Sequence, residues 1–563
     1  MVNVTVIADH FEATIRDHPK MKLKEIQRRV ASEIHVNVNL TRCKRAKKRV
    51  DERLSGNFKE EFALLWDYAD ELRAKNPGST IKMAVQRVTP NSPPHFKRFF
   101  VCFDSLKKGW KEGCRPILGL DGCFLKGPFK SELLSAVGRD ANNQMYPVAW
   151  AIVEVEYTDS WAWFLNLLAA DLDLEDGFGF TIISDQQKGL EIAINDVLPR
   201  AEHRNCARHV FANWIGRKKL KSYEFDFWEI VKATTEREWE DKFEALTQKD
   251  ELVAKDLKSK SPKHWTKAIF GCHSKCDMVD NNICETFNSI ILEARYKSII
   301  IMLEEIRVKL MTRIVEKRKF CKSWKQNYGS LVKRKFDQNK KDSIEWNMVW
   351  NGDNDYEVKK GRKQYIVKLQ DRICSCRSWQ LTDLPCLHAC CAIWHMGGDP
   401  DDYLDQCYHK NTYMKAYAYA LHPINGAHDW IKYGIESVLP PIERKMPGRP
   451  KKIGERLKMN QRKKSPDNLG NNNSNDPNSK STSTTSVMSN TLSSSAHKEK
   501  QKQNTVDEMD QTYYSGLRSK AFNSHQMSIN GSSVQRKSPN KKHKFIAYLI
   551  NTQESTAQKQ LKK

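Results

Sequence analysis

Hydrophobic and polar positions alternate between strand-like and helix-like periods in the first half of the chain. Three apolar runs of strand length succeed one another, RPILGLDGCF, SELLSAVGRD and MYPVAWAIVEV. The segment SWAWFLNLLAADL then repeats apolar residues at helical spacing, FTIISD forms a fourth strand-like run, and QKGLEIAINDVLP is a second helical pattern. Short apolar runs between polar segments are typical of buried strands, and apolar residues three and four apart are typical of amphipathic helices. The pattern predicts an α/β domain from about residue 98 onward.

The order of these segments narrows the fold class. Three strands, a helix, a strand and a helix are expected in succession, with a fifth strand just before Cys206. A hairpin-linked antiparallel group that is extended by parallel strands through helical crossovers has this order. The order is compatible with a ribonuclease-H-like core, and we expect this domain, with a helical insertion, to span residues 98–300.

A polar, helix-prone module is predicted over residues 1–90. Apolar residues recur at helical spacing from Leu23 to Ile34, VNVNL breaks the pattern, and TRCKRAKKRVDERL begins a second, strongly basic helix. Two helices with a short break can form a DNA-reading hairpin. A small helical module whose basic face is only solvated fits the same residues, because the basic helix carries no specific readout signature.

Composition indicates a reducing compartment. The opening segment MVNVTVIADHFEATIRDHPK carries charges throughout and lacks the apolar core of a signal peptide. No run reaches the roughly 18 apolar residues of a membrane span. We therefore expect an intracellular protein with no membrane partner, in which the 15 cysteines are metal ligands or core thiols rather than disulfides.

The residues from about 440 to 563 have a different composition. From Pro441 onward there are 24 Lys and Arg against 9 Asp and Glu, which supplies +15 of the formal net charge of +25. Runs such as NNNSNDPNSKSTSTTSVMSNTLSSS offer little apolar surface, so a disordered basic tail is expected. Its charge favours a polyanionic partner such as nucleic acid, although a tail that only aids solubility or nuclear import has the same composition.

Two aspartates directly follow apolar strand residues. Asp121 ends ILGLD, Asp185 ends TIISD, and Glu285 begins a helical pattern in VDNNICETFNSIILEARY. Neighbouring strand ends can bring carboxylates together, and close carboxylates repel one another unless a hard divalent cation lies between them. Taken singly, each acid is more often a helix cap or a surface residue. The pattern raises the hypothesis of a cation-dependent site built on three acids.

The segment CSCRSWQLTDLPCLHACCAIW concentrates metal-ligating side chains. Cys374, Cys376, Cys386 and His388 offer thiolates and an imidazole at short spacing, which is a ligand set of structural zinc. A hairpin with Gly361 near its turn precedes the ligands and LHACCAIWHM begins a helix after them, so a ββα unit is predicted. Cys390 and Cys391 are expected to be buried thiols, and an irregularly spaced set is an alternative metal candidate: Cys272, His273, Cys276 and Cys284.

Five segments resemble the transposase domain of Mutator-like elements, a family rich in plant members. They are LDGCFLKG, YPVAWAIVEVEYTDSWAWFL, IISDQQKGL, HRNCARHVFANW and DNNICETFN. The C-x-C-x9-C-x-H spacing resembles the SWIM zinc finger that follows this domain in the family. The N-terminal helices resemble the helical half of the family's DNA-binding region, before which members usually carry a zinc segment of cysteine and histidine.

The resemblance implies roles for particular residues. Asp121, Asp185 and Glu285 would form the acidic triad of a metal-dependent DNA strand-transfer site, with magnesium as the expected ion and zinc in the finger. Cys206 and His209 match a C-x-x-H motif of the family. A role in packing or in handling DNA ends is as reasonable for this pair as metal binding, because two ligands alone do not make a zinc site.

The segment MPGRPKK resembles an AT-hook, in which Arg449 would enter the minor groove of A·T-rich DNA with Lys451 and Lys452 beside it. The longer stretch KMPGRPKKIGERLKMNQRKK is also typical of a nuclear-import signal, and one positive charge can serve both. A nuclear protein that binds DNA is therefore expected, with a second copy of the chain as a further candidate partner and no small-molecule substrate.

Two functions remain open at this point. The intact triad favours a transposase that cuts and joins DNA, whereas the long basic tail favours a domesticated, non-catalytic DNA-binding regulator with the same fold. The predicted organisation has five parts: a helical module at residues 1–90, the α/β core at 98–300, a helical connector at 301–345, the zinc finger at 346–410 and the basic tail at 440–563.

Overall fold

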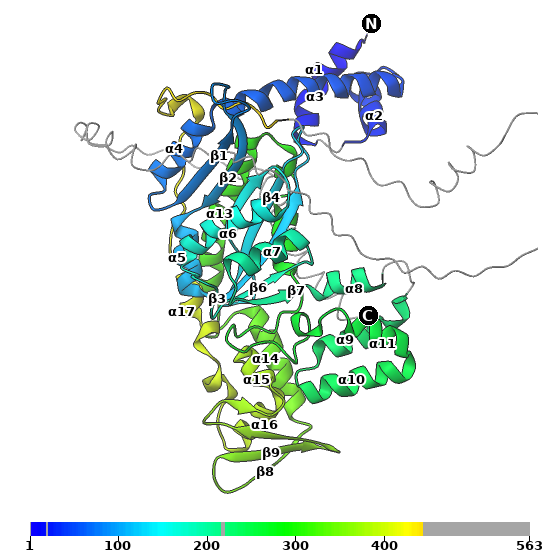
Figure 1. The fold of residues 1–563 in the computed structure, drawn as a ribbon, viewed down its shortest axis with the longest axis vertical. Coiled ribbons are helices and arrows are strands. Elements are labelled where there is room, and N and C mark those ends of the chain that lie inside the picture. The colour runs from blue at the N-terminus through cyan, green and yellow to red at the C-terminus, as the bar shows by residue number, and fades with distance from the viewer. Residues whose placement is uncertain (1, 19–20, 216–219, 443–563) are drawn as a thin grey trace, which may run out of the picture. The chain divides into compact units, whose positions relative to one another are not determined.

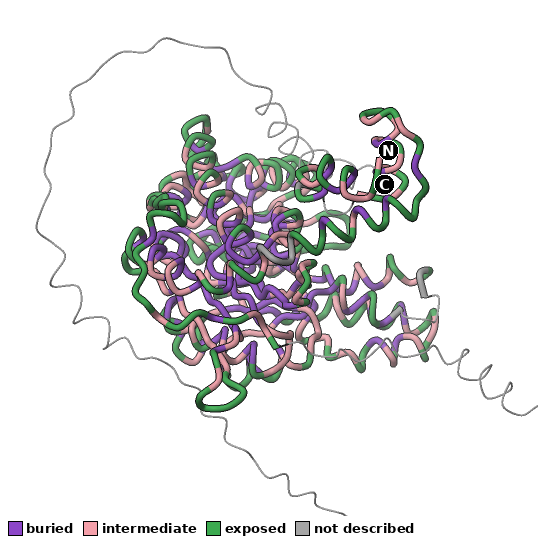
Figure 2. The backbone as a smooth tube through the Cα atoms, turned by 90° about the horizontal axis from the view of Figure 1, so that it is seen from above, coloured by how far each residue is buried: buried purple, intermediate pink, exposed green. Residues whose placement is uncertain are grey.

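The structure is a computed structural model that describes residues 2–18, 21–215 and 220–442 of the 563-residue chain (Figure 1). The predicted tail from residue 443 on, with Arg449, Lys451 and Lys452, lies outside these described residues. Within them, no helix is both long enough and apolar enough to cross a membrane. Figure 2 shows buried residues gathered in the interior of the main folded body, with exposed residues on its surface.

A seven-stranded mixed sheet forms the centre of the fold, with the strand order β1-β2-β5-β4-β3-β6-β7. Strands β3, β4 and β5 pair antiparallel, whereas β6 pairs parallel with β3 and β7 pairs parallel with β6. The strands predicted from the apolar runs are confirmed. The bounds are β1 Thr80–Gln86, β2 His95–Cys102, β3 Cys114–Phe124, β4 Glu132–Asp140, β5 Met145–Val153, β6 Thr181–Ser184 and β7 Glu202–Asn205.

The first two strands were not predicted, because charged residues interrupt their apolar pattern. Arg98 lies in the middle of β2, yet it is buried. Its guanidinium pairs with the Glu154 carboxylate at 2.8 Å and with Asp159 at 2.5 Å. A buried cation is tolerated only when it is paired in this way, so the arginine belongs to the sheet despite its charge.

Helices connect and cover the strands. Helix α6 connects β5 to β6, and α7 connects β6 to β7, as the helical spacing predicts. Trp161 and Phe164 of α6 are fully buried, and their rings lie edge to face at 5.8 Å. The helices of this part are α4 Leu65–Lys75, α5 Asp104–Gly113, α6 Thr158–Leu172 and α7 Lys188–Val197.

A helical insertion separates β7 from the next element of the core. It has its own apolar cluster, in which the rings of Trp214, Phe227 and Trp265 stack at 5.8 and 5.3 Å. The insertion is therefore stabilised by its own side chains as well as by the sheet. Its elements are α8 Ala207–Ile215, α9 Glu224–Lys232, α10 Glu236–Lys249 and α11 Glu251–Lys258, with short turns of 3₁₀ helix at Leu220–Tyr223 and Pro262–His264; α12 Asn282–Ile290 follows.

Three N-terminal helices pack around a separate core, α1 Val4–Asp17, α2 Leu23–Glu33 and α3 Leu40–Ala63. The two predicted helices correspond to α2 and α3. The Asn39 side chain caps α3 by accepting a hydrogen bond from the Arg42 N–H at 2.9 Å. Cys43, Ala46 and Val50 of α3 face this core, and most of the basic residues between them are exposed: Lys44, Arg45, Lys48 and Arg49. Helix α3 is therefore amphipathic, with an apolar side in the core and a basic side toward solvent.

A second, four-stranded antiparallel sheet has the order β11-β10-β9-β8 and follows two long helices. The predicted hairpin is confirmed as β9 and β10, and Gly361 at φ 58° forms its turn with Arg362. Two strands and a short helix were not predicted in this unit. Its elements and the preceding helices are α13 Ile299–Lys322, α14 Ser330–Ser343, β8 Asn347–Trp350, β9 Asp355–Lys360, β10 Lys363–Lys368, β11 Ile373–Cys374, α15 Ser378–Thr382 and α16 Leu387–His395.

After this unit the chain returns to the seven-stranded sheet. The Tyr146 hydroxyl donates to the Ala416 carbonyl at 2.9 Å, and a Cβ at Gly113 would lie 2.2 Å from the Ala416 nitrogen. Further on, the Leu439 N–H donates to the Pro94 carbonyl at 2.8 Å. The last elements are α17 Lys410–Ala416 and the 3₁₀ turns Pro400–Tyr403, Gln406–Tyr408 and Ala427–Asp429; Ala294–Tyr296 precedes α13.

Candidate functional site

The parallel pairing of β3 and β6 brings two of the predicted acids to the same level. Gly119 of β3 pairs with Ile183 of β6, and Asp121 and Asp185 each lie two residues further along the sequence. Asp185 directly follows β6, as expected, whereas Asp121 still lies within β3, which continues to Phe124. Parallel strands place residues of equal register side by side, about 4.8 Å apart at the backbone. The two carboxylates are therefore neighbours.

Helix α12 carries the third predicted acid and is fixed to β3 by two asparagines. The Asn281 side chain donates to the Leu120 carbonyl at 2.9 Å, and the Asn288 side chain donates to Oδ2 of Asp121 at 2.7 Å. Glu285 lies between them, in the first turn of α12, and is exposed. A Cβ at Gly119 would lie 2.4 Å from the Asn281 Oδ1, so this glycine permits the close approach of α12.

A fourth acid, Glu156, completes the cluster and was not predicted. It follows β5 in the segment that leads to α6, and a Cβ at Gly122 would lie 2.7 Å from its Oε2. The Trp161 indole donates to Glu156 Oε1 at 3.2 Å, which orients the carboxyl group. Its position had little signal in the sequence, because Glu156 lies three residues after the end of β5, whereas Asp185 directly follows β6.

Burial and mutual repulsion shift the pKa values of this cluster. The pKa of Asp121 is raised to about 7, chiefly because burial disfavours its charged form and then because of the Asp185 charge. The pKa of Glu156 is also raised to about 7, by burial first and by Asp185 next. No described lysine or arginine forms an ion pair with Asp121, Glu156, Asp185 or Glu285. The cluster is thus a set of carboxylates without an ion-pair partner among the described lysines and arginines.

Oxygen donors of this kind suit a hard divalent cation such as magnesium. A cation would also remove the repulsion that raises the two pKa values. In the described part of the chain, however, these acids do not gather into a compact group of three ligand atoms. The donor chemistry fits a divalent ion, and the magnesium assignment stays a prediction.

Cys206 and His209 connect α8 to the acidic cluster. The Cys206 N–H donates to the Ser184 carbonyl at 2.7 Å, and the Cys206 thiol accepts from the Asn281 N–H at 3.3 Å. His209 lies close enough to Asp121 for its charge to lower the pKa of that acid. Within the described residues the pair joins no compact metal-ligand group. Its contacts are those of a packing motif that places α12.

The four predicted zinc ligands come together. One ligand atom from each of Cys374, Cys376, Cys386 and His388 lies within 4.8 Å of the others, and all four residues are buried. Cys374 ends β11, Cys376 follows it before α15, and Cys386 is the N-cap of α16, the helix on which His388 lies. Three thiols and one imidazole at this spacing could hold a zinc ion in a tetrahedral site.

The His388 ring is held in place by two aromatic side chains. Its Nδ1 lies 3.6 Å from the Cys374 sulfur, and its ring stacks on Tyr365 at 4.1 Å and meets Trp346 edge to face at 4.4 Å. Nδ1 is therefore the nitrogen that faces the thiols. Hydrogen bonding between the thiols lowers the pKa of Cys376 and raises that of Cys374, and burial raises the pKa of Cys386, so one thiol of the three is favoured as the thiolate that zinc requires.

The alternative cysteine set does not form a metal site among the described residues. The Cys276 sulfur accepts a hydrogen bond from Arg139 at 2.8 Å, whereas Cys284 lies beside Gly119. His273 instead contacts the Thr181 hydroxyl at 3.0 Å. Both Cys390 and Cys391 lie outside the zinc-ligand group; Cys390 is buried, as expected, whereas Cys391 is only half-buried.

The fold and the acidic cluster define a mixed α/β domain with carboxylates collected at the ends of its central strands. Comparison with known families adds one match: the family described as the MULE transposase domain matches residues 117–213. The matched segment contains Asp121, Asp185, Cys206 and His209. No curated protein matches the chain. This part of the chain is therefore similar to the transposase domain of Mutator-like elements.

Proposed function

We propose that the chain is a Mutator-like transposase, or a protein derived from one, that binds DNA and cuts and joins it at the acidic cluster. The convergence of Asp121, Asp185 and Glu156 beneath α12, inside a segment similar to the MULE transposase domain, carries the proposal. The strand order also supports it. Three antiparallel strands extended by two parallel strands through α6 and α7 are the connection expected of a ribonuclease-H-like core.

The residues of the cluster have distinct tasks in this proposal. Asp121, Asp185 and Glu285 would hold two magnesium ions, which supply activation of the attacking hydroxyl and stabilisation of the leaving oxygen. Asn288 orients the Asp121 carboxylate through its 2.7 Å hydrogen bond. Glu156 adds a further carboxylate, and because its pKa is raised to about 7 without a metal, it would release a proton when cations bind near neutral pH.

Structural zinc in the Cys374, Cys376, Cys386 and His388 set is the second part of the proposal. These four side chains are buried, and thiolates this close to one another would repel each other unless a metal ion lay between them. Zinc would join β11 to α16 and so close the small unit of a SWIM-type finger.

DNA binding is proposed for the exposed face of α3. Arg42, Lys44, Arg45, Lys48 and Arg49 lie on this face, opposite the buried side of the helix. The helix follows α2 after a short turn, which is the order of a helix-turn-helix hairpin with α3 as the reading helix. With the basic tail, this surface is consistent with work in the nucleus on a polyanionic partner.

The test of the enzyme proposal is Asp185→Asn, which replaces a carboxylate by an amide of nearly equal size. Full-length protein would be mixed with magnesium and DNA that carries the inverted repeats flanking its own coding region. We expect strand cleavage to fall roughly a thousandfold, equivalent to about 4 kcal/mol of barrier. Asp196→Asn, an exposed aspartate of α7, is the matched control and should cleave normally. Equal cleavage by both variants would refute the assignment.

A non-catalytic DNA-binding regulator is the second candidate function. It is favoured by the acids not forming a compact three-ligand group within the described residues. If the unmutated protein bound DNA but did not cleave it with either magnesium or manganese, this function would replace the first. Asp185→Asn should then leave the cellular phenotype unchanged.

A further inference from the structure

An exposed aromatic ring lies directly beyond the acidic cluster. Phe124 is the last residue of β3, three residues after Asp121, and its side chain is 59% exposed. Three residues of extended strand span about 10 Å, and residues three apart point to opposite faces of a strand. The ring therefore lies on the face of Gly122 and Glu156, and not on the face of the Asp121 carboxylate. A single exposed apolar residue needs no explanation by itself. Phe124 differs from other single exposed apolar residues in its fixed backbone and in the lysines nearby.

The backbone that carries Phe124 is firmly held. The Arg295 guanidinium donates two hydrogen bonds to the Phe124 carbonyl, at 2.9 and 2.5 Å. In return the Lys126 N–H donates to the Arg295 carbonyl at 2.8 Å, and the Leu125 N–H donates to the Ser131 carbonyl at 2.9 Å. These bonds fix both ends of the loop between β3 and β4, so the ring extends from an ordered backbone.

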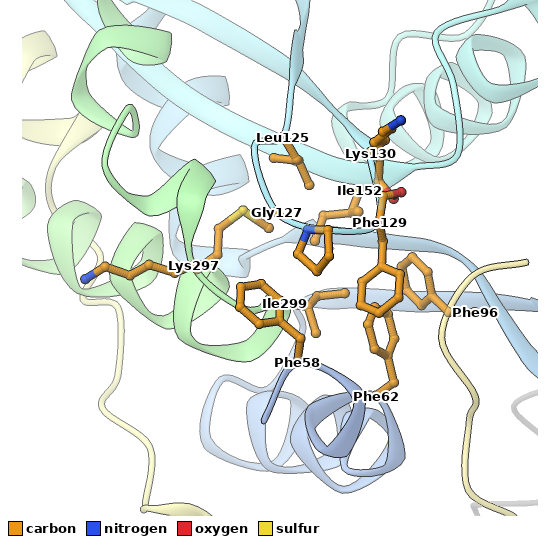
Figure 3. A pocket seen from close by; sticks show the side chains of 13 residues that line it. Phe58, Phe62, Phe96, Leu125, Gly127, Phe129, Lys130, Ile152, Lys297 and Ile299 are labelled. Atoms are coloured by element: carbon orange, nitrogen blue, oxygen red, sulfur yellow. The ribbon is translucent and has the colours of Figure 1, made fainter. Parts of the chain in front are cut away.

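An apolar pocket beneath this loop anchors it further (Figure 3). Phe129 enters the pocket and meets Phe62 of α3 edge to face at 5.2 Å, while Phe58 covers Gly127. The cavity is only about 40 Å³, far below the roughly 300 to 1,000 Å³ of small-molecule sites. The pocket therefore holds the loop in place by packing, and it is too small to bind a ligand.

Two lysines of the loop that follows β3 add positive charge at this end of the strand, where the strand partner of Phe124 is Glu132. The Lys126 ammonium lies 5.5 Å from the centroid of the Phe124 ring. Lys126 and Lys130 are exposed, and neither is ion-paired with a described carboxylate. In Figure 3 the amine of Lys130 points away from the aromatic residues of the pocket. A flat apolar ring flanked by free ammonium groups is the combination that binds unpaired nucleic-acid strands.

We propose that Phe124, Lys126 and Lys130 form a stacking platform for an unpaired base of the DNA strand that enters the acidic cluster. This inference rests on the proposed function and deepens it, because it specifies the form of the DNA. Bases within a continuous duplex already stack on their neighbours, so a protein ring can stack only on a base that is unpaired or extruded. The substrate class is then DNA with a single-stranded extension or an opened end.

Binding measurements without metal test the platform separately from catalysis. A fluorescent duplex with a 3′ single-stranded extension that contains 2-aminopurine would be compared with the same duplex left blunt, both in EDTA. We expect Phe124→Ala to weaken binding of the extended DNA about tenfold, a loss typical of one stacked base, and to abolish quenching of 2-aminopurine. Binding of the blunt duplex should be unchanged.

Two variants make the result specific. Phe124→Leu keeps an apolar side chain and should behave like the alanine variant, whereas Phe124→Trp should retain stacking. Phe178 is the matched control, because it is 68% exposed and has Arg200 at 4.2 Å over its ring, but it precedes β6 at the end opposite Asp185. Phe178→Ala should bind both DNAs normally.

The outcomes separate the two proposals. Unchanged binding by Phe124→Ala and Phe124→Leu, or equal losses on extended and blunt DNA, would overturn the platform whatever the protein does with magnesium. Preferential binding of extended DNA that depends on Phe124, together with no cleavage in magnesium, would support the platform and refute only the enzyme.

Discussion

Replacement of Cys376 by serine is expected to unfold the zinc unit, defined as residues 347–395 from β8 to α16. The four ligand side chains are between 0 and 6% exposed, so water cannot replace a lost ligand without opening the unit. Structural zinc contributes about 10 to 16 kcal/mol in small fingers, or about 2.5 to 4 kcal/mol for each of four ligands. Loss of one ligand should therefore weaken zinc binding about 10²- to 10³-fold.

Two measurements on the full-length protein examine this expectation. Plasma mass spectrometry should find one zinc per unmutated chain and little in Cys376→Ser. Hydrogen exchange of the β9 and β10 amides should change from slow to fast in the variant, and in the unmutated protein after chelation, because these strands pack on the ligands.

Cys391→Ser is the matched control. Cys391 is a half-buried thiol on α16, and its sulfur lies 3.4 Å from the Trp346 carbonyl, outside the ligand group. This variant should keep its zinc and its slow exchange. The reasoning is refuted if the unmutated protein contains no zinc, or if the β9 and β10 amides of Cys376→Ser stay protected.

Three further changes have defined outcomes. Gly122→Ala places a Cβ 2.7 Å from Glu156 Oε2 and should lower DNA cleavage at least tenfold in a nicking assay without weakening DNA binding. Burial, and then the His264 charge, lowers the pKa of His203 to about 4 from 6.5, so the unfolded state binds the extra proton. The contribution of His203 to stability should therefore fall by up to about 3 kcal/mol between pH 6.5 and pH 4, measured as the difference between urea titrations of the unmutated protein and of His203→Gln. Replacing both Arg42 and Arg45 by alanine should reduce the slope of log affinity against log salt by about 1.8 if each contacts one phosphate, and an unchanged slope would exclude α3 from the DNA interface.

The zinc ligands could be predicted because their signal is local. Cys374, Cys376, Cys386 and His388 lie within 15 residues, and thiolate and imidazole at such spacing have few other uses. The position of Asp185 was also predictable, since it directly follows the apolar run of β6, whereas β3 continues for three residues beyond Asp121, so the apolar run did not mark the end of that strand. In each case the sequence neighbours of a residue determine its position.

Glu156 and the first two strands depended on distant contacts. Glu156 joins the acids because Gly122, on another strand, leaves room for its carboxyl group. Arg98 is buried within β2 only because Glu154 and Asp159 neutralise it from beyond β5. Gly122 is far from Glu156 in the sequence, and Glu154 and Asp159 are far from Arg98. Periodicity relates only residues a few positions apart, so it cannot predict these contacts.

The return of the chain to the seven-stranded sheet after the zinc unit affects how the protein can fold during synthesis. The apolar core that surrounds β3 includes Tyr413, Trp430 and Val438. A ribosome that adds about 5 to 20 residues per second needs roughly 15 to 65 s to proceed from Ile117 to Val438. Throughout that interval the sheet is exposed on the surface that these late residues cover, while the zinc unit emerges earlier. The main core is thus completed only after the metal-binding unit has left the ribosome.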